Sequence, residues 1–88
     1  MDNDVHTECA CRICGYCDDS AFWRHGFFTS EICSCCGSQS GIEDITLESV
    51  RHVRGYWVGH GAQWFSPKCK PENWDLLKQM SNLLPEWR

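Results

Sequence analysis

Two copies of a Cys-x2-Cys-Gly motif, here called the first and second knuckle, constrain this chain more than any other feature. The first knuckle comprises residues 11–15 and the second comprises residues 33–37. Two residues between the cysteines let the backbone turn so that both sulfurs face one ion, and the final glycine supplies the positive φ by which the chain leaves the turn. Four thiolates arranged as a tetrahedron are typical of structural zinc. The predicted ligands of one structural zinc ion are Cys11, Cys14, Cys33 and Cys36.

Four of the eight cysteines remain outside this set. Cys17 forms a further Cys-x2-Cys pair with Cys14, although no glycine follows it, and Cys9 lies close to the first knuckle. The side chain of Cys35, inside the second knuckle, is expected to point away from the metal. Cys69 lies between two lysines, which would lower its thiol pKa and make it reactive, or it is a small buried hydrophobe. Whether these four cysteines bind metal or react stays open at this point.

The length of 88 residues leaves room for one domain, and a core this small needs support from a metal or from disulfides. The N-terminus is acidic and polar and lacks the apolar run of a secretory signal. No stretch reaches the roughly 18 apolar residues of a membrane span. We therefore expect a cytoplasmic protein, without membrane contact, whose reduced thiols bind metal. A disulfide scaffold is the disfavoured alternative.

The charges are distributed unevenly, although the formal net charge is only −4. Residues 1–50 hold nine acidic and two basic side chains, whereas residues 51–88 hold six basic and three acidic ones. Four thiolates around one divalent ion would add negative charge to the acidic half. This pattern indicates either an ordinary solvated surface or a dipolar surface that steers a charged partner.

The hydrophobic pattern predicts one small α+β domain, in which a zinc-ribbon-like N-terminal half precedes two helices. Residues 1–8 are expected to be flexible. Residues 9–43 form the zinc-knuckle region with short strands, one of them over residues 27–32. Residues 44–60 are expected to form the first helix, because apolar residues recur at spacings of three and four. These residues are Leu47, Val50, Val53 and Trp57.

The helix boundaries have their own signals. Either Asp44 or Thr46 can cap the first helix. The second helix is predicted over residues 71–84, because Pro71 suits the first turn of a helix and Pro85 would stop it. Its expected apolar stripe is Leu76, Leu77, Met80, Leu83 and Leu84.

At the knuckles the sequence resembles a group of small bacterial cysteine-rich proteins, the CPCC-type zinc-ribbon-like proteins. Their pattern is C-P-x-C-G-Y, then E-I-C-P-x-C and an acidic turn, and it corresponds here to residues 11–16, 31–36 and 43–44. Proline is usual where Arg12 and Ser34 stand, which is expected to loosen the turns without removing a ligand. The resemblance implies a zinc-ribbon-like fold, and some small bacterial proteins of this kind are suspected immunity proteins that neutralise toxins. It continues weakly through Arg54, Trp57, Gly61, Trp64, Ser66, Pro71 and Trp74.

The preferred function is a protein-binding module, specifically an immunity or antitoxin-type inhibitor of a bacterial toxin. Aromatic residues and arginine are the usual anchors of protein interfaces. Trp57 and Trp74 fit the buried face of a helix and are assigned to the core. The acidic half would mimic nucleic acid against a basic nuclease toxin. The candidate partner-binding residues are Trp64, Phe65, Trp87, Arg51 and Arg54.

Two other functions stay open, and an enzyme is disfavoured. A zinc ribbon that binds nucleic acid would use the basic, aromatic stretch over residues 51–70. A rubredoxin-like iron carrier would use the same knuckles, although the gap between them is short for a rubredoxin and the helices would have no role. No recognisable catalytic motif surrounds the histidines, which are His6, His25, His52 and His60.

Overall fold

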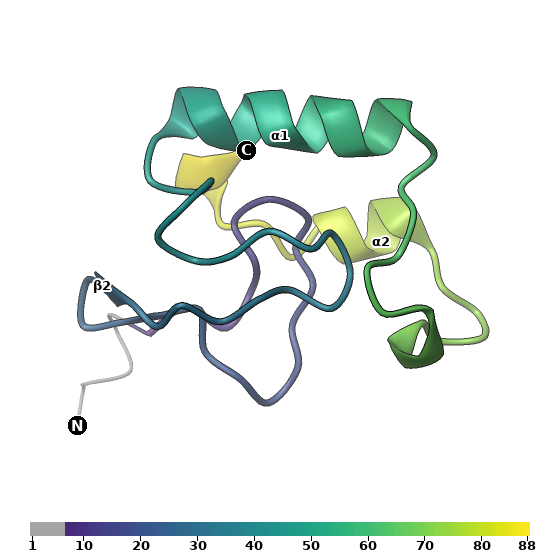
Figure 1. Cartoon of the computed structure of the whole chain (residues 1–88), viewed down its shortest axis with the longest axis horizontal. Coiled ribbons are helices and arrows are strands. Elements are labelled where there is room, and N and C mark those ends of the chain that lie inside the picture. The colour runs from purple at the N-terminus through teal and green to yellow at the C-terminus, as the bar shows by residue number, and fades with distance from the viewer. Residues whose placement is uncertain (1–6) are drawn as a thin grey trace.

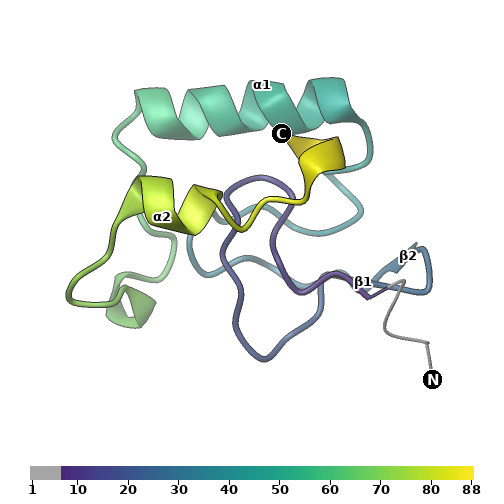
Figure 2. The same cartoon turned by 180° about the vertical axis from the view of Figure 1, so that it is seen from behind.

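The computed structural model describes residues 7–88 and has the predicted small α+β architecture, with two helices after the knuckle region (Figure 1). Helix α1 lies along one side of the molecule. The two knuckle loops lie beneath it, the strands lie at one end, and α2 lies toward the other (Figures 1 and 2). The elements are β1 (Trp23–Arg24), β2 (Phe27–Phe28), α1 (Leu47–Gly59), η2 (Pro67–Cys69), α2 (Leu76–Met80) and η3 (Pro85–Trp87), where η denotes a 3-10 helix.

The two strands form an antiparallel hairpin in which Trp23 pairs with Phe28. The turn places His25 and Gly26 at φ values of 53° and 82°, and positive φ at both central residues matches the right-handed twist of a hairpin. The strand predicted over residues 27–32 is therefore wrong in its extent. Ser30 has a φ of 67°, which ends the extended backbone, and beyond it Ile32 makes only an isolated bridge to Gln39.

Helix α1 begins where the sequence indicated. Thr46 caps it, because its hydroxyl oxygen accepts a hydrogen bond from the amide of Ser49 at 3.1 Å. Val50 and Trp57 are buried, as the spacing predicted. The other candidate cap, Asp44, lies buried outside the helix and accepts hydrogen bonds from the Trp23 indole and the Gly41 amide.

Helix α2 is much shorter than predicted. The Asp75 carboxylate accepts hydrogen bonds from the amides of Leu77 and Lys78 and caps the helix. The cap thus lies four residues after Pro71, where the prediction placed the start of the helix. The predicted apolar stripe is wrong at Leu77, which is 77% exposed. Leu76 packs against the core and Leu83 is buried, although Leu83 lies beyond the helix. Neither α1 nor α2 is long and apolar enough to cross a membrane, and the same holds for every helix within residues 7–88.

The core surrounds the knuckle cysteines and includes a chain of aromatic rings. Trp64 makes edge-to-face contacts with Tyr16 and Trp74, at centroid distances of 5.3 Å and 5.4 Å. Trp74 contacts Trp57 in the same way, at 6.4 Å. Such pairs stabilise a core beyond the area they bury, by about 0.5–1.5 kcal/mol each. These rings join α1 and the segment before α2 to the first knuckle.

Arg12 connects both ends of the described chain. Its guanidinium lies between the rings of Trp23 and Trp87, at 3.7 Å and 3.9 Å from their centroids. It also pairs with the Glu8 carboxylate at 2.7 Å and 2.8 Å and donates to the Asp44 carbonyl. The prediction of a flexible segment over residues 1–8 is thus wrong at Glu8, whose amide also bonds to the Trp23 carbonyl. Residues 1–6 lie outside the described part of the chain.

Candidate metal centre

The two knuckles have the same local structure. In the first, the Gly15 amide donates to the Cys11 carbonyl at 2.9 Å, and in the second the Gly37 amide donates to the Cys33 carbonyl at 2.9 Å. The φ values of these glycines are 85° and 81°, a conformation that glycine adopts without steric cost. The amides of Cys11 and Cys33 donate hydrogen bonds to the carbonyls of Tyr16 and Ser38, both at 2.8 Å. The two turns thus keep the same hydrogen bonds with Arg12 and Ser34 at the positions where proline is usual.

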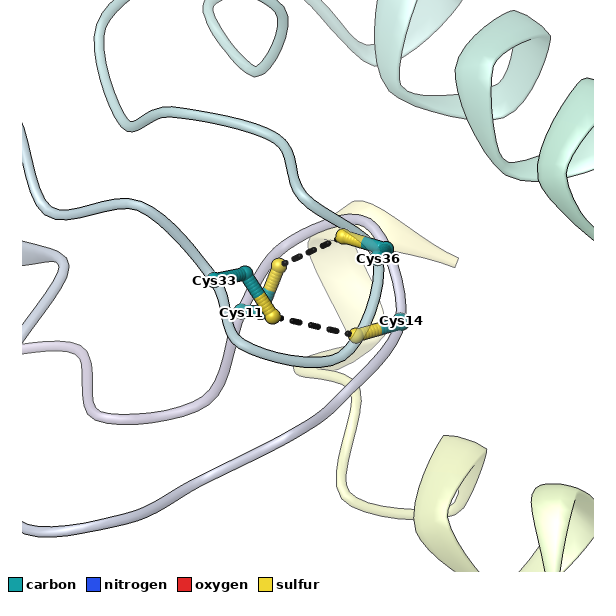
Figure 3. A group of neighbouring side chains, drawn as sticks. All are labelled: Cys11, Cys14, Cys33 and Cys36. Atoms are coloured by element: carbon teal, nitrogen blue, oxygen red, sulfur yellow. Dashed lines mark hydrogen bonds between the residues drawn. The ribbon is translucent and has the colours of Figure 1, made fainter. Parts of the chain in front are cut away.

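The four predicted ligands lie together, with their sulfurs turned toward one centre (Figure 3). All four Sγ atoms lie within 4.8 Å of one another. Cys11 and Cys36 are separated by 3.7 Å between sulfurs, and Cys14 and Cys33 by 3.6 Å. A tetrahedral site with metal–sulfur bonds of about 2.3 Å has edges of roughly 3.8 Å. The cluster could therefore hold one metal ion with little rearrangement.

The electrostatics of the cluster favour a bound cation. Hydrogen bonds from Cys14, then Cys33 and Cys36, hold the pKa of the Cys11 thiol well below its ordinary value. The pKa of Cys14 is raised, chiefly by its hydrogen bond with Cys11, since a second thiolate beside the first is costly. A divalent cation removes this repulsion and lets all four thiols ionise, so metal binding releases protons.

The inner carbonyls of the two knuckles are satisfied by different donors. In the first knuckle, the Arg54 guanidinium donates to the carbonyls of Ile13 at 2.6 Å and Arg12 at 2.9 Å. In the second knuckle, the corresponding carbonyls belong to Cys35 and Ser34. They accept hydrogen bonds from the backbone amides of Phe65 and Ser66, at 2.9 Å and 2.8 Å respectively. The Arg54 side chain of α1 thus binds the inner carbonyls of the first knuckle, and the backbone of residues 65–66 binds those of the second.

Polar side chains also lie beside the sulfurs. The hydroxyl of Ser38 lies 3.1 Å from the Cys36 sulfur and 3.7 Å from the Cys11 sulfur. Gln79 of α2 donates to the Cys14 carbonyl at 3.2 Å and to the Cys35 sulfur at 3.3 Å. Such neighbours orient metal ligands and tune their basicity. No sequence signal indicated a role for Ser38 or Gln79, because neither residue belongs to a motif.

The other cysteines take different positions. Cys35 is buried against Gln79 and does not belong to the four-sulfur group. Cys69 is exposed in η2, so the interpretation of it as a small buried hydrophobe is wrong.

Cys9 and Cys17 form a disulfide that encloses the first knuckle. The expectation that all thiols are reduced is therefore wrong for this pair. The knuckle reverses the chain direction and brings the two Cα atoms to 5.4 Å, within the normal range for a disulfide. Their nearly symmetric placement around the first knuckle was a signal in the sequence. The cytoplasmic location stays a prediction.

The predicted partner-binding residues do not gather on one surface. Trp64 is buried in the aromatic chain, and Trp87 covers Arg12. The Arg54 guanidinium donates its hydrogen bonds to backbone carbonyls, including that of Trp87 at 2.5 Å. Arg51 donates to the carbonyl oxygen of Arg88. Of the five residues, Phe65 presents the largest apolar surface, since 61% of it is exposed.

Fewer acidic side chains of residues 1–50 are available to a partner than their number indicated, because several are paired or buried. Glu8 pairs with Arg12, Asp44 is buried, and Glu43 accepts a hydrogen bond from the Gln39 amide. Two further acidic residues, Asp2 and Asp4, lie outside the described part of the chain. The acidic side chains that stay well exposed in this half are Asp18, Asp19 and Glu48.

Comparison of this chain with protein-family models, with curated proteins and with solved structures finds no match. The resemblance to the CPCC-type proteins rests on the motifs alone and stays a prediction.

Proposed function

We propose that this chain is a structural-zinc protein that acts as a protein-binding module. The observation that carries the proposal is the group of four cysteine sulfurs, three of whose residues are at most 2% exposed. Four thiolates complete a tetrahedral shell and leave no position for substrate or water. The ion then serves folding, because its binding free energy becomes folding free energy.

Zinc is the proposed ion, because closed four-cysteine sites are typical of structural zinc. The competing iron site of a rubredoxin would have similar metal–sulfur distances. Visible absorption separates the two, since a ferric tetrathiolate is red and a zinc site is colourless. Protein purified from cells grown with both metals should be colourless and should contain zinc by elemental analysis.

A binding role, rather than catalysis, is supported by the surroundings of the histidines. His25, His52 and His60 are exposed, and the hydrogen bond found for their side chains joins His60 to the Tyr56 carbonyl. General acid–base catalysis needs a titratable group held within hydrogen-bond reach of another reacting group. A nucleic-acid role is supported less well, because Trp57 and Trp64 are buried and cannot stack on bases.

The surface that best suits a protein partner is the hairpin surface, defined here by Phe27, Phe28 and Ile42. Their side chains are 75%, 52% and 65% exposed. The Phe28 ring packs directly over Gly41, which joins the hairpin to the loop that carries Ile42. The contact with Gly41 places Phe28 next to the residue that precedes Ile42, Phe27 is exposed on the same hairpin, and exposed apolar side chains of this kind are found at interaction sites. Two further exposed isoleucines, Ile32 and Ile45, belong to the same part of the chain.

The proposed partner is a bacterial toxin, which this protein would inhibit by covering its active surface. The exposed acidic residues Asp18 and Asp19 and the charge of a metal–thiolate centre suit a basic toxin. This finer proposal comes from the resemblance and from the charge pattern.

The test compares two substitutions of equally exposed residues. Phe27→Ser alters the hairpin surface, whereas Leu77→Ser alters an exposed leucine in α2 that is 77% exposed. The protein encoded beside this gene is tested as the candidate toxin. Wild type and Leu77→Ser should bind and inhibit it, and Phe27→Ser should do so far more weakly. Equal loss in both variants, or in neither, would rule out the hairpin surface.

A further inference from the structure

The Cys9–Cys17 disulfide differs from the metal cluster in its access to solvent. Cys17 is exposed and lines an open surface pocket of about 380 Å³ between the first knuckle and α2. The residues that line the pocket include Tyr16, Trp74 and Lys78. Cys11, Cys14 and Cys33, in contrast, are at most 2% exposed. A small thiol can therefore reach the Cys17 sulfur without entering the cluster.

The disulfide also closes a loop around half of the metal site. It joins the chain two residues before Cys11 to the chain three residues after Cys14, so two of the four proposed ligands lie inside one closed loop. The second knuckle has no such covalent link, and neither Cys35 nor Cys69 pairs with a cysteine. A loop closed in advance leaves less backbone entropy to lose when the metal binds.

We propose that the Cys9–Cys17 disulfide is a redox-sensitive clasp that sets the affinity of the metal site. The proposal rests on the metal site of the proposed function. With the clasp closed, the first knuckle is preorganised and binds zinc tightly. With the clasp open, the knuckle loses that constraint, and more backbone entropy is lost when the metal binds. The protein then holds zinc more weakly and unfolds more readily.

The reductant is a small-molecule thiol of the glutathione class. Its thiolate attacks the exposed Cys17 sulfur, the disulfide bond breaks, and Cys9 leaves as a thiolate that takes up a proton. The Cys9 sulfur lies 3.2 Å from the Asp18 carbonyl oxygen, to which the new thiol can donate. A second thiol then attacks the mixed disulfide and releases Cys17 as a thiol. Two electrons pass to the protein, and the two reductant molecules leave as their own disulfide.

The test measures zinc affinity by competition with a chromophoric chelator, in glutathione buffers from oxidising to reducing. Zinc is present throughout so that it protects the cluster cysteines, and alkylation with intact-mass analysis reports the state of the clasp. The oxidised wild type should bind zinc about tenfold more tightly than the reduced wild type, or better. Cys9→Ser/Cys17→Ser should match the reduced wild type at every glutathione ratio. Cys69→Ser, which removes an exposed thiol elsewhere, should respond as the wild type does.

The outcomes separate this inference from the proposed function. Equal zinc affinity of the oxidised and reduced wild type would overturn the clasp and leave the zinc site standing. A redox response that persists in Cys9→Ser/Cys17→Ser would also overturn it, because another cysteine would then be responsible. Absence of zinc binding in both states would overturn the zinc site and the clasp together. The wild-type comparison decides the question even if the double variant fails to fold.

Discussion

The two knuckles are near copies of each other, yet the molecule supports them in opposite ways. Their turns share the same hydrogen bonds and the same glycine conformation. The first is held by distant side chains, namely Arg54 and Gln79, and by a disulfide. The inner carbonyls of the second are bound by the backbone amides of Phe65 and Ser66, and the side chains beside this knuckle contact its sulfurs instead. The carbonyls of the same motif can thus be bound by a specific side chain or by backbone amides. A point mutation removes a side-chain donor but leaves a backbone amide in place.

Metal removal should have the largest effect, because the two knuckles share one ion. Structural zinc contributes about 10–16 kcal/mol in small zinc domains, more than the total stability of most domains of this size. Chelation should therefore abolish the near-ultraviolet circular dichroism of the tryptophans, and added zinc should restore it. A native-like spectrum in excess chelator would mean that the side-chain and backbone supports suffice without metal.

Replacing Arg54 tests the support of the first knuckle. Arg54→Met removes the donor to the carbonyls of Arg12, Ile13 and Trp87 and should lower the free energy of unfolding of the zinc-loaded protein by about 2–3 kcal/mol. The matched control is Ser66→Ala, which keeps the backbone amide that supports the second knuckle and should be nearly neutral. Urea denaturation measures both. A loss of stability in Ser66→Ala as large as that in Arg54→Met would show that the second knuckle also depends on a side chain at this position.

The two glycines offer a direct contrast. Alanine at either position meets the cost of a positive φ, about 1–2 kcal/mol. At Gly15 a Cβ atom would also lie 2.5 Å from the backbone oxygen of Gln79, whereas at Gly37 the nearest atom, at 2.9 Å, belongs to the exposed ring of Phe65. Gly15→Ala should therefore cost more than Gly37→Ala, by roughly 1 kcal/mol or more. Thermal unfolding of the two zinc-loaded variants checks the order, which equal midpoints would refute.

The smallest effect is expected at the residue that follows each glycine. Ser38→Ala removes the hydroxyl beside the Cys36 sulfur and should lower the free energy of unfolding by about 1 kcal/mol. Tyr16→Phe, at the matching position of the first knuckle, removes a hydroxyl and keeps the ring that packs on Trp64. It should change stability little. If Tyr16→Phe proves the more costly substitution, the account of hydroxyl support at the second knuckle is wrong.

The parts of the fold that the sequence predicted are those that depend on local spacing. The Cys-x2-Cys-Gly motifs predicted the four clustered cysteines and both positive-φ glycines. The three- and four-residue spacing predicted the buried face of α1, and Thr46 predicted its start. The turn of each knuckle and the start of α1 are decided within a few residues of chain. The meeting of the two knuckles is a long-range feature, and it was predicted because four thiolates complete one metal site.

The parts that could not be predicted depend on which distant residues meet. Arg54 looked like a surface anchor, but the carbonyls of the first knuckle need a donor and its guanidinium is within reach. Trp87 looked free, but it covers Arg12. The second helix was placed too early because Pro71 suits a first turn, whereas Asp75 supplies the cap that starts α2. In each case a long-range contact or a competing local signal decided the outcome.

The central claim is that Cys11, Cys14, Cys33 and Cys36 hold one structural zinc ion. Native mass spectrometry of the purified protein tests it most directly, because it gives the metal mass and the number of ions per chain at once. We expect one zinc ion per chain in the wild type and none in Cys14→Ser, with unaltered zinc content in Cys35→Ser. A wild type without metal or with two zinc ions, or a Cys14→Ser variant that keeps its zinc, would contradict it.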